Sequence, residues 1–132
     1  MIGGSQWQGG AGASAEALQA LRDVAPVPLP QSFYDLLAFS DGGEGSLSVL
    51  PLTFFLNPAA EITRLERDGT LKHFFPGFFA FGSDGEGEIV AFDYRTGTAP
   101  YPIIGFDMAN IDPGAPVSAI AADFDQFLAL LV

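Results

Sequence analysis

The apolar positions of this chain follow a helical spacing in four segments, where they recur three or four residues apart on one face. Residues that favour helix ends border these segments. Ser14 and Asp123 are of the types that cap helix N-termini, and Asp68-Gly69 is typical of a helix C-terminus. The pattern predicts helices at about residues 15–24, 30–40, 58–67 (with Asn57 as N-cap) and 124–131.

The second predicted helix has the clearest pair of faces. Phe33 and Leu37 are four residues apart, so they share one helical face, which we expect to pack inward. Asp35 and Gln31 lie on another side of the helix and are expected to face water. The helix should end in a turn at Asp41-Gly42-Gly43, because these residue types tolerate positive φ.

From Phe78 onward the apolar residues become dense and rich in strand formers. Strands are expected at residues 78–81, 89–94 and 101–106. Both alternating registers of these strands are apolar, so we expect burial on both faces of the sheet or cover by helices. Helices, then a strand meander, then a final helix predict an α+β fold.

Two of these strands should form a hairpin. The glycines and carboxylates of residues 82–87 are suited to its turn, so Phe81 and Phe92 should lie in adjacent antiparallel strands with Phe92 buried. The upstream segment "SLSVLPLTFFL" also favours a strand, but Pro51 interrupts it. That interruption predicts a bulge or an edge position.

Length and composition favour one domain over residues 1–132. The chain is 48% hydrophobic and contains 13 Phe, which is ample for a single buried core. Residues 1 to about 13 are rich in glycine and are expected to be loose, apart from Trp7. A loop with Pro113, Gly114 and Pro116 is expected before the last helix.

Charge changes the range of partners. Five basic residues face 16 acidic ones, which gives a net charge of −11. Nucleic-acid phosphates and anionic membrane surfaces repel such a protein, so we expect neither as a partner. A basic protein would instead be attracted and steered. Without a secretory signal pattern or an apolar run near the ~20 residues of a membrane span, a cytoplasmic protein is expected.

The densest group of carboxylates is the loop "GSDGEGE", which must be weighed as a chemical site. A calcium loop that started at Asp84 would need glycine where Ile89 stands and glutamate where Arg95 stands. No lysine or helix follows the glycines, as a phosphate-binding loop requires, and carboxylates on a glycine-rich tip rarely act as a catalytic pair. The loop is therefore best interpreted as a solvated hairpin turn.

Other chemistry is also poorly supported. The chain has no Cys, so it forms neither disulfides nor thiolate metal sites. Its single histidine, His73, stands beside two Phe and is expected to be a half-buried packing residue, without a second histidine at metal-ligand spacing. We therefore expect no catalytic residues, no metal and no cofactor.

Several stretches together resemble one family. "LPQSFYDLLAFSDGGEG", "PGFFAFGSDGEGEIVAFDYRTG" and "DFDQFLALL" resemble the SUKH superfamily, and more closely its branch related to the yeast Smi/Knr cell-wall-synthesis regulator. The segment "SVLPLTFFL" departs from that pattern, because members often carry a tryptophan or acidic residues there. The resemblance implies a curved antiparallel sheet with helices packed around it, and no catalytic activity.

The resemblance also implies a role in protein binding. Bacterial members are regarded as immunity proteins that neutralise a cognate toxin, often a nuclease or deaminase, whereas the eukaryotic branch acts as an interaction and signalling scaffold. Both roles stay open for this chain, and a small enzyme is a third, less supported class.

Independently of the family, an acidic surface suits a toxin whose own site is basic because it grips phosphates. The candidate contacts lie on two turns, and for each of them the favoured interpretation is still an ordinary solvated carboxylate, because surface charges usually do nothing specific. These candidates are Asp41, Glu44, Asp84, Glu86 and Glu88.

Overall fold

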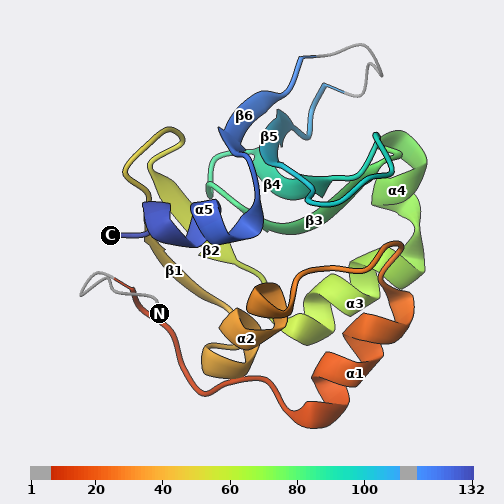
Figure 1. The fold of residues 1–132 in the computed structure, drawn as a ribbon, viewed down its shortest axis with the longest axis vertical. Helices are drawn as coiled ribbons and strands as arrows, with labels where there is room; N and C mark the ends of the chain where they lie inside the picture. The colour runs from red at the N-terminus through yellow and green to blue at the C-terminus, as the bar shows by residue number, and fades with distance from the viewer. Residues whose placement is uncertain (1–6, 111–115) are drawn as a thin grey trace.

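The computed structural model describes residues 7–110 and 116–132. Within these residues, six strands form one antiparallel sheet and five helices pack around it (Figure 1). The helices are α1 (Ala15–Val24), α2 (Gln31–Phe39), α3 (Ala59–Asp68), α4 (Thr70–Phe74) and α5 (Phe124–Leu130). The strands are β1 (Gly43–Ser46), β2 (Thr53–Leu56), β3 (Phe78–Ser83), β4 (Glu88–Asp93), β5 (Ile103–Asp107) and β6 (Ser118–Ala121).

The sheet is a simple meander in which each strand pairs with the next along the chain. It curls around the helices that cover one of its faces (Figure 1). The expected α+β fold with a curved antiparallel sheet is therefore confirmed.

The central hairpin of the sheet is β3–β4, and it matches its prediction. Phe79 lies opposite Phe92, a bulge follows at Phe81, and Phe92 is fully buried. After the bulge, Gly82 lies against β2 so closely that an added Cβ would be 2.4 Å from the backbone oxygen of Phe55. The bulge and this glycine together let β3 approach β2 while Phe79 and Phe81 both point into the core.

The core on the covered face is aromatic. Phe33 of α2 meets the rings of Phe79, Phe81, Phe92 and Phe124 edge to face, with centroids 5.3–6.2 Å apart. These geometries are favourable for phenyl pairs because ring edges carry partial positive charge and ring faces partial negative charge. Helix α2 buries Phe33 and Leu37 and exposes Asp35 and Gln31, so the predicted faces of this helix are confirmed.

The opposite face of the sheet has a smaller apolar cluster of Ala80, Ala91, Ile104 and Phe106. Side chains from α4 and from the segment before β6 pack against it, among them Phe75. Burial on both faces explains why the strands lack a clean alternation of polar and apolar residues.

Helix ends show where the sequence pattern was sufficient. The Ser14 hydroxyl accepts a hydrogen bond from Ala17 N (3.1 Å) and the Asp123 carboxylate accepts one from Gln126 N (2.8 Å), so both predicted N-caps are confirmed. Gly69 closes α3 with φ 77°. Helix α3 begins at Ala59 with Pro58 as its N-cap, one residue later than expected, since the sequence indicated Asn57 as the N-cap and Pro58 as the first helical residue.

Three elements were not expected. β1 occupies a glycine-rich stretch that the sequence indicated as a turn, and it pairs along its length with β2. β2 is therefore an interior strand. Pro51 lies in the loop of a β1–β2 hairpin (residues 47–52), and not at a bulge or on an edge strand as expected. The short elements β6 and α4 were also missed; α4 and the loop after it contain "LKHFFPG".

Residues 8–13, which were expected to be loose, make backbone hydrogen bonds to β1, Asp41 and α2, and residues 1–6 lie outside the described residues. Trp7 Nε1 donates to the Ser40 hydroxyl (3.2 Å), and Gln8 exchanges two backbone hydrogen bonds of 2.8 Å with Glu44. Ala13 N donates to Leu37 O (2.8 Å). Hydrogen bonds therefore hold this segment along β1 and α2.

Candidate functional site

The β1–β2 and β3–β4 hairpin loops lie at the same end of the sheet. β3 runs antiparallel to β2 with Ser83 opposite Phe55, so the β3–β4 turn lies where β2 begins, next to the β1–β2 loop. The end of β5 joins them, because Met108 N donates to Gly87 O (3.1 Å). We call this region the hairpin end; it comprises the β1–β2 loop (residues 47–52), the acidic turn (residues 84–88) and residues 107–108.

The acidic turn has a defined conformation. The Asp84 carboxylate accepts hydrogen bonds from the backbone N–H groups of Glu86 (2.7 Å) and Glu88 (3.0 Å). Gly85 adopts φ 79° directly under the Phe55 ring, where an added Cβ would be 2.5 Å from a ring carbon. The turn therefore presents its carboxylates from a fixed backbone, and Phe55 lies beside them as an aromatic surface.

Glu88 is the carboxylate of this turn that its surroundings perturb most. Partial burial raises the pKa of Glu88, and the nearby carboxylates of Asp84 and Asp107 raise it further. Asp107 faces Glu88 across the β4–β5 pair. Sequence reasoning missed Asp107, because its position beside Glu88 depends on the register between β4 and β5.

Glu44 belongs to the same side of the sheet. It lies on β1 opposite Phe55, which in turn lies opposite Ser83, so one row across three strands connects Glu44 to the start of the acidic turn. Two strand spacings separate Glu44 from Ser83, or about 10 Å between backbones. Its side chain is exposed.

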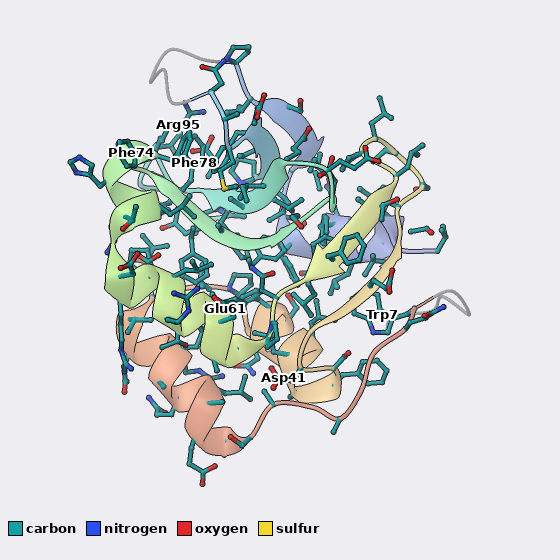
Figure 2. All side chains as sticks on the ribbon, turned by 180° about the vertical axis from the view of Figure 1, so that it is seen from behind. Trp7, Asp41, Glu61, Phe74, Phe78 and Arg95 are labelled. Atoms are coloured by element: carbon teal, nitrogen blue, oxygen red, sulfur yellow. The ribbon has the colours of Figure 1, made fainter. Side chains whose placement is uncertain are left out.

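Asp41 is different from the other four candidates. Its carboxylate accepts a hydrogen bond from Ala59 N (2.7 Å), and its side chain is half-buried between α2 and the start of α3 (Figure 2). That geometry gives Asp41 a structural task, the capping of α3. The structure thus groups Asp84, Glu86, Glu88 and Glu44 with Asp107, and separates Asp41 from them.

The positive charges lie elsewhere. All five basic residues are in α1, α3, α4 and the turn after β4, and the hairpin end contains none of them. Arg64 pairs with Glu61, Lys72 with Glu66 (3.0 Å) and Arg95 with Asp93 (2.8 Å). Figures 1 and 2 show α4 and Arg95 on the side away from the β1–β2 hairpin. Within residues 7–110 and 116–132, the carboxylates of the hairpin end form no ion pair with a basic side chain.

The remaining candidate chemistry has less support in the structure. His73 is exposed on α4, edge-on to Phe74 with centroids 5.0 Å apart, so the expectation of a half-buried histidine was wrong. Among the described residues, no group of three or more His, Cys, Asp or Glu could hold a metal ion. No helix within residues 7–110 and 116–132 is long and apolar enough to cross a membrane.

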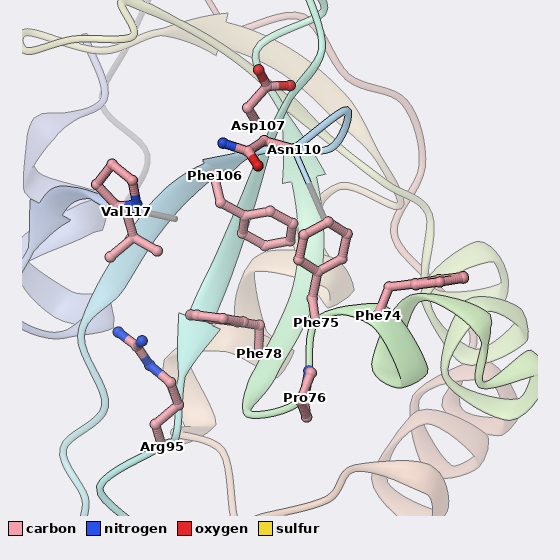
Figure 3. Close-up of a pocket in the computed structure, with 10 residues that line it drawn as sticks. Phe74, Phe75, Pro76, Phe78, Arg95, Phe106, Asp107, Asn110 and Val117 are labelled. Carbon is pink, nitrogen blue, oxygen red and sulfur yellow. The ribbon is translucent and has the colours of Figure 1, made fainter. Parts of the chain in front are cut away.

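An aromatic pocket lies between α4 and the end of β5, on the face of the sheet that carries Ala80, Ala91, Ile104 and Phe106 (Figure 3). Phe75, Phe78 and Phe106 line it, and the Arg95 guanidinium lies 4.7 Å from the Phe78 ring centroid. Its volume is about 80 Å³. Small-molecule sites usually have several hundred Å³, so this pocket is too small for a cofactor of ordinary size.

Comparison with known proteins finds one matching protein family. The sequence model of the SMI1 / KNR4 family (SUKH-1) matches residues 12–130, which is nearly the whole chain. No curated protein matches it.

Proposed function

We propose, from the premise that this chain belongs to the SMI1 / KNR4 family (SUKH-1), that it is a binding protein without catalytic activity that neutralises a basic toxin domain. The family is known for immunity-type proteins and is generally non-catalytic. The observation that carries the proposal is the hairpin end, where the acidic turn and Asp107 lie together without a basic residue among them, with Glu44 nearby on β1.

The charge pattern suggests how neutralisation works. A toxin that cuts or edits nucleic acid needs lysine or arginine around its site to hold phosphates. Carboxylates on a rigid turn offer the same negative charge without a reactive bond, so the bound protein occludes the site. Long-range attraction between the two surfaces also speeds their encounter.

The geometry of the turn favours binding over turnover. The Asp84 carboxylate is engaged by two backbone N–H groups of its own turn, and Glu86 is exposed to water. Glu88 has a raised pKa, but it is only partly buried beside an exposed turn, whereas general acid–base catalysis needs such a group in a cleft that excludes water. An exposed turn is instead suited to contact with a complementary surface.

The test is the association rate with a purified, catalytically inactive toxin domain encoded beside the gene for this protein. The triple variant Asp84→Asn, Glu86→Gln, Glu88→Gln should associate about tenfold more slowly at low salt, because steering contributes about 10-fold or more to such rates. The difference should shrink at physiological salt, where screening acts within about 8 Å.

A matched control removes the same amount of charge at the other end of the molecule. Glu16→Gln, Asp23→Asn, Asp35→Asn changes three exposed carboxylates of α1 and α2 and should alter the rate much less. Equal slowing in both variants would mean that only net charge matters, and would remove the hairpin end from the interface. If the unmodified protein bound no such toxin, the immunity role would fail and a scaffold role would replace it.

A further inference from the structure

We infer that the β1–β2 loop is the apolar anchor of the interface, and that the basic partner carries an apolar groove beside its positive patch into which Leu50 and Leu52 insert. This inference rests on the proposed function and adds the second half of the contact. It makes the interface a pair of adjacent features, one apolar and one acidic, that the same partner must match.

The loop exposes an unusual amount of apolar surface. Leu50 is 75% exposed, Leu52 52% and Val49 39%, and the nearest charged residues along the chain are Glu44 and Glu61. Single exposed apolar residues are common on protein surfaces, whereas several in one loop indicate a binding site.

The loop is held in one conformation. Leu52 adopts φ 74°, a left-handed backbone that leucine rarely occupies. Leu47 N donates to Leu52 O (2.7 Å) and Leu52 N donates to Val49 O (2.9 Å). The C-terminal segment ties the loop from outside, because Ser48 N donates to Leu130 O (2.9 Å).

Strain and rigidity both favour a functional interpretation. A left-handed position would be easier for glycine or asparagine, so an exposed leucine there carries a conformational cost that those residues would avoid. A loop that its own hydrogen bonds already order loses little freedom on binding, which strengthens an apolar anchor. The exposed leucines therefore have the properties of a binding hot spot.

The position of the loop identifies its occupant. The β1–β2 loop and the acidic turn lie at one end of the sheet, and the Phe55 ring lies against Gly85 between them. A partner that covers the β1–β2 loop also meets the acidic turn. Its groove should therefore be bordered by lysine or arginine, which complement the carboxylates. A second copy of this chain, with its own net charge of −11, and an anionic lipid surface are both poor matches.

The experiment uses Leu50→Ser and Leu52→Asn with the inactive toxin domain described above. Asparagine tolerates the left-handed backbone, so Leu52→Asn removes the apolar side chain without a new strain. Each variant should dissociate at least about tenfold faster, as for other hot-spot residues, with an association rate within about twofold of the unmodified protein. This effect should be the same at low and high salt, unlike that of the acidic-turn variant.

Phe74→Ser is the matched control, because Phe74 is 44% exposed on α4, on the side of the molecule away from the β1–β2 loop (Figure 2). It should leave both rates unchanged, and thermal unfolding should show that all three variants remain folded. Dissociation of both loop variants within about twofold of the unmodified protein would overturn the inference and leave the proposed function intact. A failure of the unmodified protein to bind would overturn the proposed function, and the inference with it.

Two further outcomes would also overturn the inference. One is a dimer, seen by sedimentation, that Leu50→Ser abolishes, because a second copy would then cover the loop. The other is binding to neutral phosphatidylcholine vesicles that Leu50→Ser abolishes, because a lipid surface would then be the occupant.

Discussion

Replacing Phe92 with alanine is the most direct test of the core that supports the hairpin end. Phe92 is fully buried on β4, the strand that leads out of the acidic turn. Its ring lies 5.3 Å from that of Phe33, 5.1 Å from that of Phe81 and 5.5 Å from that of Phe124, measured between centroids. The change therefore removes a phenyl group from contact with several others at once.

The expected loss of stability can be bounded. Phenylalanine-to-alanine changes in cores cost about 3–5 kcal/mol, from lost transfer energy and the cavity left behind. Because three close ring pairs are broken, and each is worth ~0.5–1.5 kcal/mol beyond its buried area, we expect about 4–5 kcal/mol. For a domain of this size that lowers the melting temperature by roughly 10–20 °C.

Urea unfolding of Phe92→Ala and of Phe74→Ala, followed by circular dichroism, measures this loss. Phe74 is partly exposed on α4, so its truncation should cost below about 1 kcal/mol. If Phe92→Ala does not fold, Phe92→Leu should still fold, with a loss of roughly 1–2 kcal/mol. Equal losses for Phe92→Ala and Phe74→Ala would refute the described core.

Three further predictions concern carboxylates. Asp41→Ala should lower the free energy of unfolding by about 1 kcal/mol, because α3 loses its cap at Ala59 N, whereas Asp41→Asn should keep most of it. The raised pKa of Glu88 means that its charged form destabilises the fold, so the free energy of unfolding should fall as pH rises through that pKa. Glu88→Gln should therefore be more stable than the unmodified protein at neutral pH, and the difference should disappear in acid. Burial alone would raise the pKa of Asp93, but hydrogen bonds from Arg95 lower it overall, so its contribution should be present at neutral pH and lost as pH falls through the lowered pKa. Denaturant unfolding of Asp93→Asn over a pH series should show that this acid-dependent part is gone. An unchanged pH profile in either the Glu88 or the Asp93 variant would contradict the assigned environment of that residue.

The fold was predictable where a local pattern sufficed. Helix α1 follows from its apolar spacing and from Ser14, and the β3–β4 hairpin follows from two apolar runs around a glycine-rich turn. β1 was not predictable in this way, because "GEGS" has no strand propensity of its own. Its strand state depends on pairing with β2 and on Gln8, and such partners are visible only in three dimensions.

The candidate site likewise has parts that depend on local sequence and parts that depend on distant residues. The acidic turn is a local feature, so its carboxylates could be predicted from neighbouring glycines. The role of Asp41 in capping α3 could not be predicted, because its hydrogen-bond partner Ala59 is 18 residues away in the sequence. The contribution of Asp107 and the proximity of the β1–β2 loop depend on strand register across the sheet.

A titration of toxin activity tests the central claim most directly, namely that this protein acts by stoichiometric binding. The active toxin domain, at a concentration well above the dissociation constant, receives increasing amounts of the protein while its reaction is followed. The account predicts that activity falls linearly to zero at one equivalent, independent of incubation time, and returns when the toxin is separated under denaturing conditions and refolded. Progressive loss of activity with a small fraction of one equivalent would contradict it, because the protein would then act by turnover.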